Sequence, residues 1–291
     1  MKKFSVVLSL LLVVLLVLAG CGAKETPSKE SSPDANAQPT KVESAEESHA
    51  AESPAQEAPA EGSGLAGKTQ LIMGTEAGFA PFEYYDEAGN VVGVDPDIAQ
   101  AIADSLGMEL VIQEMDFDAI ISEVQSGRID FGAAGMSITE ERAKQVDFSI
   151  PYGASKQVLV VRADNTAITG GESLAGKKVG VQLGTIADLL LTDEYPDVTV
   201  ERYKKYFEAV SDLTNGRLDA ILMDILPAQE FLAQNTELKV LEEPLMVDEY
   251  AIAVKKGNTE LLDAINKVVQ ELIDSGKIDE FMQKHSAAAE Q

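Results

Sequence analysis

The feature that most constrains the fold is a regular alternation of short apolar runs and amphipathic segments from about residue 68 to 285. Runs such as 69–74, 110–113, 178–181 and 220–223 have the length and composition of buried strands. The segments between them carry apolar residues at the three- and four-residue spacing of helices. Strand–helix alternation is typical of mostly parallel sheets that are covered by helices on both faces. The sequence therefore predicts an α/β fold.

The elements are numerous enough for two α/β lobes within roughly 220 residues. Two segments are suited to cross between the lobes: 157–162 (QVLVVR) and the residues just before 250–254 (YAIAV). The segment 250–254 is itself predicted to form one long return strand. If both segments cross, the first lobe is discontinuous and consists of 68–157 and 250–291, while 158–249 forms the second lobe with the crossovers. A chain of this design can close on a ligand.

The N-terminus has the layout of an export signal. Lys2 and Lys3 precede an apolar run from Val6 to Ala19, which is too short to span a membrane comfortably. The residues Leu-Ala-Gly-Cys that end at Cys21 resemble the lipobox of bacterial lipoproteins, in which the cysteine carries a lipid after cleavage. We predict a lipoprotein signal peptide over 1–20 and a lipidated Cys21. A spanning anchor that is never cleaved is the alternative.

Residues 21–67 are rich in Pro, Ser, Ala and Glu and contain almost no large apolar side chains. Such a segment cannot bury enough surface to offset the entropy of ordering, so we predict a disordered tether. With Cys21 as anchor, the tether places the folded part at the outer face of the cell membrane.

Composition excludes several classes of function. A net charge of −26 argues against a nucleic-acid partner. A single cysteine permits no intramolecular disulfide, and the only histidines are His49 and His285, which argues against zinc clusters and against catalytic sets built on histidine. We therefore expect no cofactor and no metal, and we expect a monomer.

Two residues have the short oxygen-bearing side chains that cap helices. Asp95 precedes Pro96, which suits a first helical position, and Thr139 precedes two acidic residues. Arg142 then lies in the first turn of the helix that Thr139 would cap, where negative charge is normally preferred. Together with the Ser137 hydroxyl and the N–H groups of the helix start, its guanidinium would form a site for a carboxylate. Solvation of Arg142, or a local ion pair, is the alternative.

Six segments resemble, in order, the signature segments of the polar amino-acid-binding proteins of ABC importers, also called extracellular solute-binding protein family 3. They are 75–83 (TEAGFAPFE), 93–98 (GVDPDI), 115–117 (MDF), 135–142 (GMSITEER), 146–149 with 151–152 (VDFS and PY), and 180–185 (GVQLGT). The similarity extends from about residue 70 to 285. It implies a two-lobed periplasmic-binding-protein (venus-flytrap) fold, in which an amino acid binds between the lobes and closure signals to a membrane permease.

The resemblance also implies roles for individual residues at the two ends of an α-amino acid. Arg142 would bind the α-carboxylate, helped by Ser137 and by the backbone N–H groups of Thr185 and Ile186. Asp224 would bind the α-ammonium group together with the carbonyl of Gly135. For Asp224 alone, a cap on the following helix is the alternative.

The remaining residues would contact the side chain of the ligand. Phe79 and Phe117 occupy the positions of two aromatic rings that sandwich it in the family, although Phe117 alone would be interpreted as core. Glu76 aligns with an acidic position that contacts the far end of the ligand, which favours a cationic or amide side chain (Arg, Lys, His or Gln); an internal salt bridge is its alternative. Two departures from the family are the neutral Gln182 and Ile186, which replaces a threonine found in many relatives.

Other functions compete with amino-acid binding for import. Some proteins of this fold are lyases that act on small carboxylic acids, and Glu76 and Asp224 are potential general acids. Cystine or another amino acid is an alternative ligand. The same fold also serves as the ligand core of receptors, but no hydrophobic segment of spanning length follows Cys21, so we expect that this chain does not itself signal across a membrane. Because Arg142 and Asp224 would hold both ends of an amino acid without an obvious proton donor for a leaving group, we expect a binding protein and not an enzyme.

Overall fold

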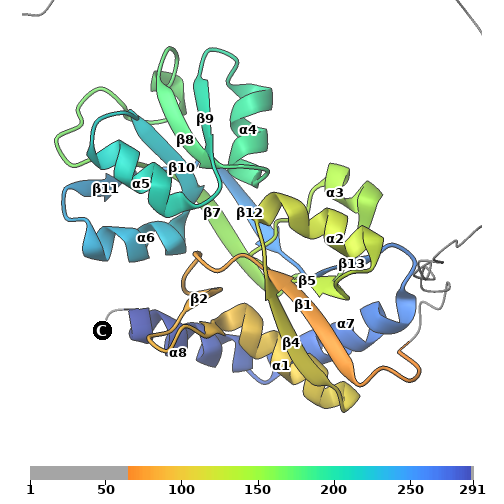
Figure 1. The fold of residues 1–291 in the computed structure, drawn as a ribbon. Coiled ribbons are helices and arrows are strands. Elements are labelled where there is room, and N and C mark those ends of the chain that lie inside the picture. Colours follow the sequence, from red (N-terminus) through yellow and green to blue (C-terminus); the bar gives the residue numbers. More distant parts are fainter. Residues whose placement is uncertain (1–64, 290–291) are drawn as a thin grey trace, which may run out of the picture. The chain divides into compact units, whose positions relative to one another are not determined.

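The computed structural model describes residues 65–289. The predicted signal peptide, Cys21 and nearly all of the predicted tether lie outside the described residues. Within 65–289 the chain forms two lobes, each built on one β-sheet (Figure 1). The two-lobed α/β fold predicted from the sequence is confirmed, but the sheets are mixed and not mostly parallel, because the strands next to the connections between the lobes pair antiparallel with their neighbours.

The first lobe contains a five-stranded sheet of order β4-β1-β5-β13-β6. β1 pairs in parallel with β4 and β5, whereas β13 is antiparallel to β5 and β6. A two-stranded hairpin of β2 and β3 lies between β1 and the first helix. The elements are β1 (Gln70–Thr75), β2 (Tyr84–Tyr85), β3 (Val91–Val92), α1 (Val94–Leu106), β4 (Glu109–Glu114), η1 (Phe117–Ala119), α2 (Ile120–Ser126), β5 (Phe131–Gly132), α3 (Glu140–Gln145), β6 (Val146–Phe148), β13 (Ala253–Lys255), α7 (Thr259–Asp274) and α8 (Lys277–Ala289).

The second lobe contains a six-stranded sheet of order β11-β7-β10-β8-β9, in which β12 also pairs with β7. β8 is parallel to β9 and β10, and β7 is antiparallel to β10, β11 and β12. The elements are β7 (Gly153–Arg162), η2 (Gly171–Ser173), β8 (Lys178–Gln182), α4 (Ile186–Glu194), β9 (Thr199–Tyr203), α5 (Tyr206–Thr214), β10 (Ala220–Asp224), α6 (Ile225–Gln234), β11 (Leu238–Val240) and β12 (Met246–Tyr250).

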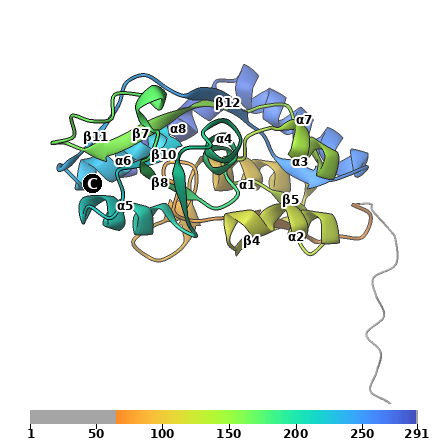
Figure 2. The ribbon, with the colours of Figure 1, turned by 90° about the horizontal axis from the view of Figure 1, so that it is seen from above.

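The first sheet is covered by helices on both faces. On one face, Leu71 and Met73 of β1 pack in the same apolar cluster as Ile98 of α1 and Ile265 of α7. On the other, α2 contributes Ile120 to a separate cluster, and Figure 2 shows α2 and α7 on opposite sides of the molecule. This is the two-sided covering that the alternation of strands and helices predicts.

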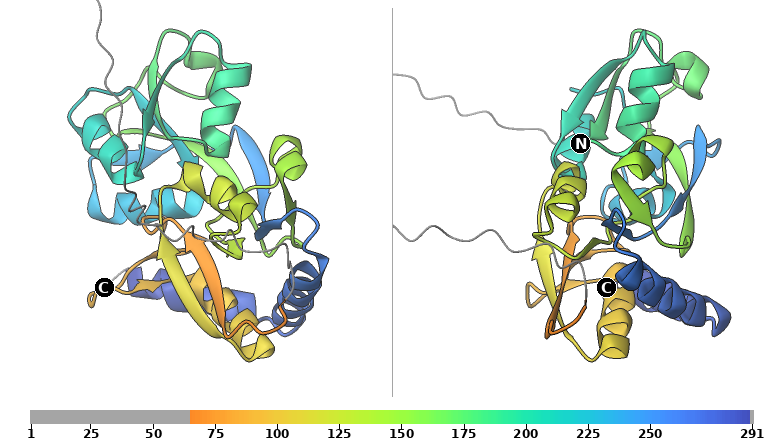
Figure 3. Two further views of the ribbon diagram at one scale, coloured as in Figure 1. Left: turned by 45° about the vertical axis from the view of Figure 1, so that its right-hand side comes forward. Right: turned by 90° about the vertical axis from the view of Figure 1, so that its right-hand side faces the viewer.

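Two strands connect the lobes. β7 follows β6 after residues 149–152, and β12 precedes β13 with only Ala251 and Ile252 between them. β7 and β12 pair with each other from Met246↔Gln157 to Tyr250↔Gly153, and Figure 3 shows them side by side in two further views. The chain therefore passes between the lobes through one antiparallel ribbon.

Two local predictions are wrong. The segment 250–254 is not one strand, because Tyr250 pairs with Gly153 in the second sheet while Ala253 pairs with Gly132 in the first, and Ala251 and Ile252 between them belong to neither strand. Asp95 does not cap α1, whose N-cap is Gly93. The Asp95 side chain is fully buried and accepts hydrogen bonds from the Gly135 N–H (2.9 Å) and the Tyr152 hydroxyl (2.8 Å) instead.

Among the described residues, no helix is both long enough and apolar enough to pass through a membrane.

Candidate functional site

Arg142 reaches from the first lobe to the second. Thr139 caps α3 as predicted, since its hydroxyl accepts a hydrogen bond from the Arg142 N–H at 3.1 Å. The guanidinium is buried and donates to the carbonyl of Ser137 (Nη1, 2.6 Å) and to that of Gly184 in the second lobe (Nη2, 2.9 Å). It lies 5.4 Å from the centre of the Phe117 ring. Burial lowers the pKa of Arg142 to about 10, so the group is still cationic at neutral pH.

Asp224 is the acidic counterpart in the second lobe. It ends β10 at the N-cap position of α6, but its side chain makes no capping hydrogen bond. Oδ1 accepts instead from the Ser155 hydroxyl (2.6 Å), the Gln157 amide (2.7 Å) and the Tyr250 hydroxyl. Burial, followed by the charge of Asp248, raises the pKa of Asp224 to about 6. The carboxylate is therefore ionised at neutral pH and held by three donors.

Arg142 and Asp224 are close enough to influence each other, because the charge of Asp224 partly offsets the effect of burial on the arginine. The two groups come from different lobes and are both nearly inaccessible to solvent. A buried cation beside a buried anion complements a ligand that carries both charges. The boundary between the lobes is therefore the candidate site.

Gly135 adopts a conformation that its neighbours require. Its φ is +51°, and a Cβ atom at this position would lie 2.7 Å from a ring carbon of Phe79. Its N–H is held by Asp95, as described above, and the carboxyl group of Glu83 lies close enough to Asp95 that burial, together with the charge of Asp95, raises the pKa of Glu83. Only glycine combines this backbone conformation with so close an aromatic ring.

The two predicted aromatic side chains are both buried at this boundary, but they have different neighbours. Phe117 lies beneath the Arg142 guanidinium, while the Phe79 ring is stacked on Tyr206 of α5, with centroids 6.2 Å apart and an interplanar angle of 25°. Tyr206 was not predicted as a site residue. In the sequence it lies among other aromatic residues, between Tyr203 and Phe207, and its partner Phe79 is far away along the chain, so nothing local marks it as a site residue.

Glu76 is engaged by the second lobe through both of its oxygens. Oε2 accepts from the Gln182 amide at 2.9 Å, and Oε1 forms an ion pair with Lys205 at 2.5 Å. Lys205 also pairs with Glu114 at 2.5 Å. The internal salt bridge that the sequence left open for Glu76 is thus present, and Gln182 joins the same group.

The start of α4 uses its polar groups locally. Thr185 is the N-cap, and its hydroxyl accepts from the Asp188 N–H (3.4 Å) and donates to the Gln182 carbonyl (2.8 Å). The N–H of Thr185 also donates to the Gln182 carbonyl, at 3.3 Å. Ile186 is the first residue of α4, where an N–H has no acceptor within the helix. Of the two N–H groups predicted for an anion, that of Ile186 is the better suited.

Asp248 is a further acidic group that sequence analysis missed. The Ser137 hydroxyl donates to its carboxylate, and the Gln157 amide approaches it at 3.4 Å. Burial raises the pKa of Asp248, which also influences Arg142 and Asp224. Its position, just before the segment predicted as a return strand and within a predicted crossing between the lobes, was the available signal. It was missed because the sequence did not show where that return strand is interrupted.

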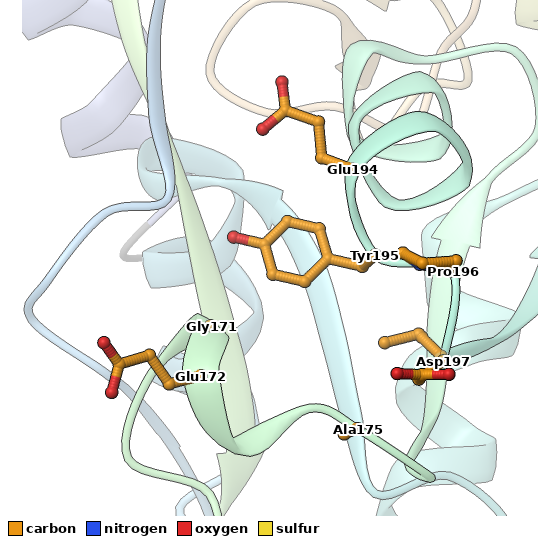
Figure 4. Close-up of a pocket in the computed structure, with 8 residues that line it drawn as sticks. Gly171, Glu172, Ala175, Glu194, Tyr195, Pro196 and Asp197 are labelled. Carbon is orange, nitrogen blue, oxygen red and sulfur yellow. The ribbon is translucent and has the colours of Figure 1, made fainter.

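A separate hollow of about 290 Å³ lies within the second lobe (Figure 4). The residues that line it are Gly171, Glu172, Ala175, Glu194, Tyr195, Pro196, Asp197 and Val198. Its three acidic residues are exposed, and none of the residues discussed above belongs to it. Across the part of the chain that the structure describes, no group of three or more His, Cys, Asp or Glu side chains could hold a metal ion.

The sequence from residue 71 to 288 matches the model of the bacterial extracellular solute-binding proteins, family 3. The chain belongs to this family. It is a family of binding proteins, and the match covers both lobes and every site residue discussed above. The fold and the buried groups at the lobe boundary thus belong to an extracellular solute-binding protein.

Three relatives show what similar family members bind. The chain is 36% identical over 225 residues to the arginine-binding extracellular protein ArtP of Bacillus subtilis (strain 168), covering 75% of this chain and 87% of ArtP. It is 34% identical over 216 residues to the L-cystine-binding protein TcyJ of Escherichia coli (strain K12), covering 74% and 81%. A solved structure of an ancestral arginine-binding protein bound to glutamine superimposes with a TM-score of 0.71 at 44% identity, covering 75% of this chain and 97% of that protein.

Proposed function

We propose that this family 3 protein is the substrate-binding subunit of an ABC amino-acid importer and that it captures a polar or cationic amino acid between its lobes. The observation that carries the proposal is the pair of buried, opposite charges, Arg142 and Asp224, which belong to different lobes. A ligand that binds both groups bridges the lobes and stabilises the closed arrangement.

The orientation of the ligand follows from the donors and acceptors at each end. The planar guanidinium of Arg142 offers two parallel donors to an α-carboxylate, supported by the start of α4 and by the Ser137 hydroxyl once it turns from Asp248 to the ligand. Asp224 and the Gly135 carbonyl would accept from the α-ammonium group. The side chain would then lie toward Phe79, Phe117 and Glu76, where aromatic faces and a carboxylate favour a cationic or amide end.

Arginine and glutamine are the first ligands to test, because similar proteins are named for arginine and one is bound to glutamine. Cystine is the next candidate, since TcyJ binds it. We expect micromolar or tighter affinity, which corresponds to about −8 kcal/mol or more favourable. We infer that the protein has no enzymatic role, because the groups that hold the ligand use both of its charged ends and leave no proton donor beside a leaving group.

A thermal-shift panel of the common amino acids and cystine tests the proposal. A ligand that binds the folded state raises the melting temperature by mass action, by an amount that grows with its concentration above Kd. We expect stabilisation by a few polar or cationic amino acids. Stabilisation by none would reject the binding function, and consumption of the stabilising compound during incubation would favour the lyase alternative.

We further propose that the protein is held at the outer face of the membrane by lipid on Cys21, next to the permease subunits to which it delivers ligand. The support is the order of basic, apolar and small residues that ends at this cysteine. Replacement of Cys21 by Ser is expected to release the protein from the membrane fraction or to leave the precursor unprocessed. Membrane fractionation and the mass of the N-terminal peptide distinguish these outcomes from unchanged anchoring, which would contradict the proposal.

A further inference from the structure

Two consecutive lysines, Lys204 and Lys205, reach from the second lobe to the first just before α5. Lys204 pairs with Asp118 at 2.8 Å and with Asp116 at 3.1 Å. Lys205 pairs with Glu76 and Glu114. Both lysines therefore bridge the lobes, and each is shared between two carboxylates.

The two lysines differ in their exposure to solvent. The side chains of Lys204, Asp116 and Asp118 are 49%, 46% and 33% exposed, respectively. Lys205 is only 21% exposed, and Glu76 is 2% exposed. Water and salt screen the first pair of contacts strongly, whereas a charge beside a buried carboxylate acts over several ångströms. Of the two lysines, Lys205 is the one whose charge a bound ligand would experience.

Lys205 forms an ion pair with Glu76, the carboxylate that the ligand's side chain is expected to reach. Glu76 already accepts from Gln182 through Oε2 and from Lys205 through Oε1, so a cationic ligand end at this carboxylate would lie beside an ammonium group. Burial lowers the pKa of Lys205, but the hydrogen bonds that it donates to Glu114 and Glu76 outweigh this effect and the pKa is raised overall. The ammonium group is therefore charged at neutral pH. Two carboxylates and one ammonium leave a single net negative charge at this end of the site.

We propose that Lys205 is a specificity-determining residue, which limits the preference of the site for cationic over neutral amino-acid side chains. The inference rests on the proposed function, since it requires the ligand's side chain to point toward Glu76. In this arrangement one site could accept both a cation and an uncharged amide, because Lys205 repels the first and leaves the second unaffected. Without the lysine, Glu76 and Glu114 would present two uncompensated negative charges.

A matched pair of ligands isolates this effect. Arginine and citrulline have nearly the same shape, but the guanidinium of arginine is cationic and the urea group of citrulline is neutral. The quantity to measure is the ratio of the Kd of citrulline to the Kd of arginine, by calorimetry on the purified protein after removal of co-purifying ligand. Loss of an ion pair between the lobes weakens closure on both ligands alike, so it cancels in the ratio.

Replacement of Lys205 by Met, which keeps an unbranched apolar stem, is expected to raise this ratio on the order of tenfold. The matched control is Lys204→Met, which also removes an ion pair between the lobes but lies among exposed partners, and which should leave the ratio unchanged. Lys205→Gln provides a second, polar variant in case Lys205→Met fails to fold.

A ratio that stays constant or falls in the folded Lys205 variants would overturn the specificity role while leaving the proposed function intact. If the wild-type protein binds neither of these ligands nor any amino acid in the thermal-shift panel, the proposed function itself fails and the role of Lys205 fails with it. A rise in the ratio for both Lys204→Met and Lys205→Met would also overturn the inference, because it would show a general effect of charge.

Discussion

Replacement of Arg142 by Ala is expected to weaken amino-acid binding by about a hundredfold to ten-thousandfold. Each charge-assisted hydrogen bond to a carboxylate contributes about 1.5 to 3 kcal/mol, and the guanidinium can form two. Every 1.4 kcal/mol corresponds to about a tenfold change in Kd. Calorimetric titration with the amino acid that gives the largest thermal shift measures the effect.

Two further variants keep this experiment interpretable. Arg128→Ala removes the same charge from an exposed side chain of the first lobe, paired with Glu123, and should bind as wild type does. Arg142→Lys retains the charge but not the two parallel donors, and we expect an intermediate loss. It also provides a test if Arg142→Ala, which leaves the carbonyls of Ser137 and Gly184 without a donor, does not fold. Unchanged affinity in folded Arg142→Ala would remove this residue from the site.

The free energy of unfolding of the protein without ligand is expected to increase as the pH is lowered from 7 to 5. Burial raises the pKa of Asp95 to about 6, while burial and the charge of Asp95 hold the pKa of Glu83 well above its usual value. A carboxyl group whose pKa is raised in the folded state binds protons more tightly there than in the unfolded chain. Its protonation therefore stabilises the fold at low pH, and this stability is lost as the pH rises through the folded-state pKa.

Asp95→Asn tests this origin of the pH dependence. The amide oxygen can still accept from the Gly135 N–H and the Tyr152 hydroxyl, but the group no longer titrates. Between pH 5 and 7, one group with a pKa near 6 accounts for roughly 1 kcal/mol. Urea denaturation should show that much less pH dependence in Asp95→Asn than in wild type. Asp104→Asn, an exposed position on the same helix, is the control and should follow wild type. An equal slope in all three proteins would contradict the assignment.

The sequence predicts those parts of the molecule that depend on local chemistry. The cap at Thr139 and the early position of Arg142 in α3 both follow from residues within one turn, and the structure contains both. The two-lobed α/β fold follows from the order of strands and helices, together with the family resemblance. Neither prediction requires knowledge of distant contacts.

Features that depend on contacts between distant segments could not be predicted in the same way. Asp95 has the sequence context of a cap, but burial beside Gly135 and Tyr152 determines what its side chain does. Lys205 and Tyr206 have no local signal, since their partners Glu76 and Phe79 lie in the other lobe. The break after Tyr250 likewise depends on which sheet pairs with each half of an uninterrupted apolar run.

The ribbon formed by β7 and β12 has a mechanical consequence. Two hydrogen-bonded strands can bend or twist perpendicular to their ladder without breaking it, but sliding one past the other would break every bond in the register from Met246↔Gln157 to Tyr250↔Gly153. The lobes should therefore move as rigid bodies by bending or twisting of this ribbon, whereas motions that require one strand to slide past the other should be suppressed. Ser155, Gln157 and Tyr250 of this ribbon all donate hydrogen bonds to Asp224. A ligand that binds this carboxylate therefore acts directly on the ribbon about which the lobes turn.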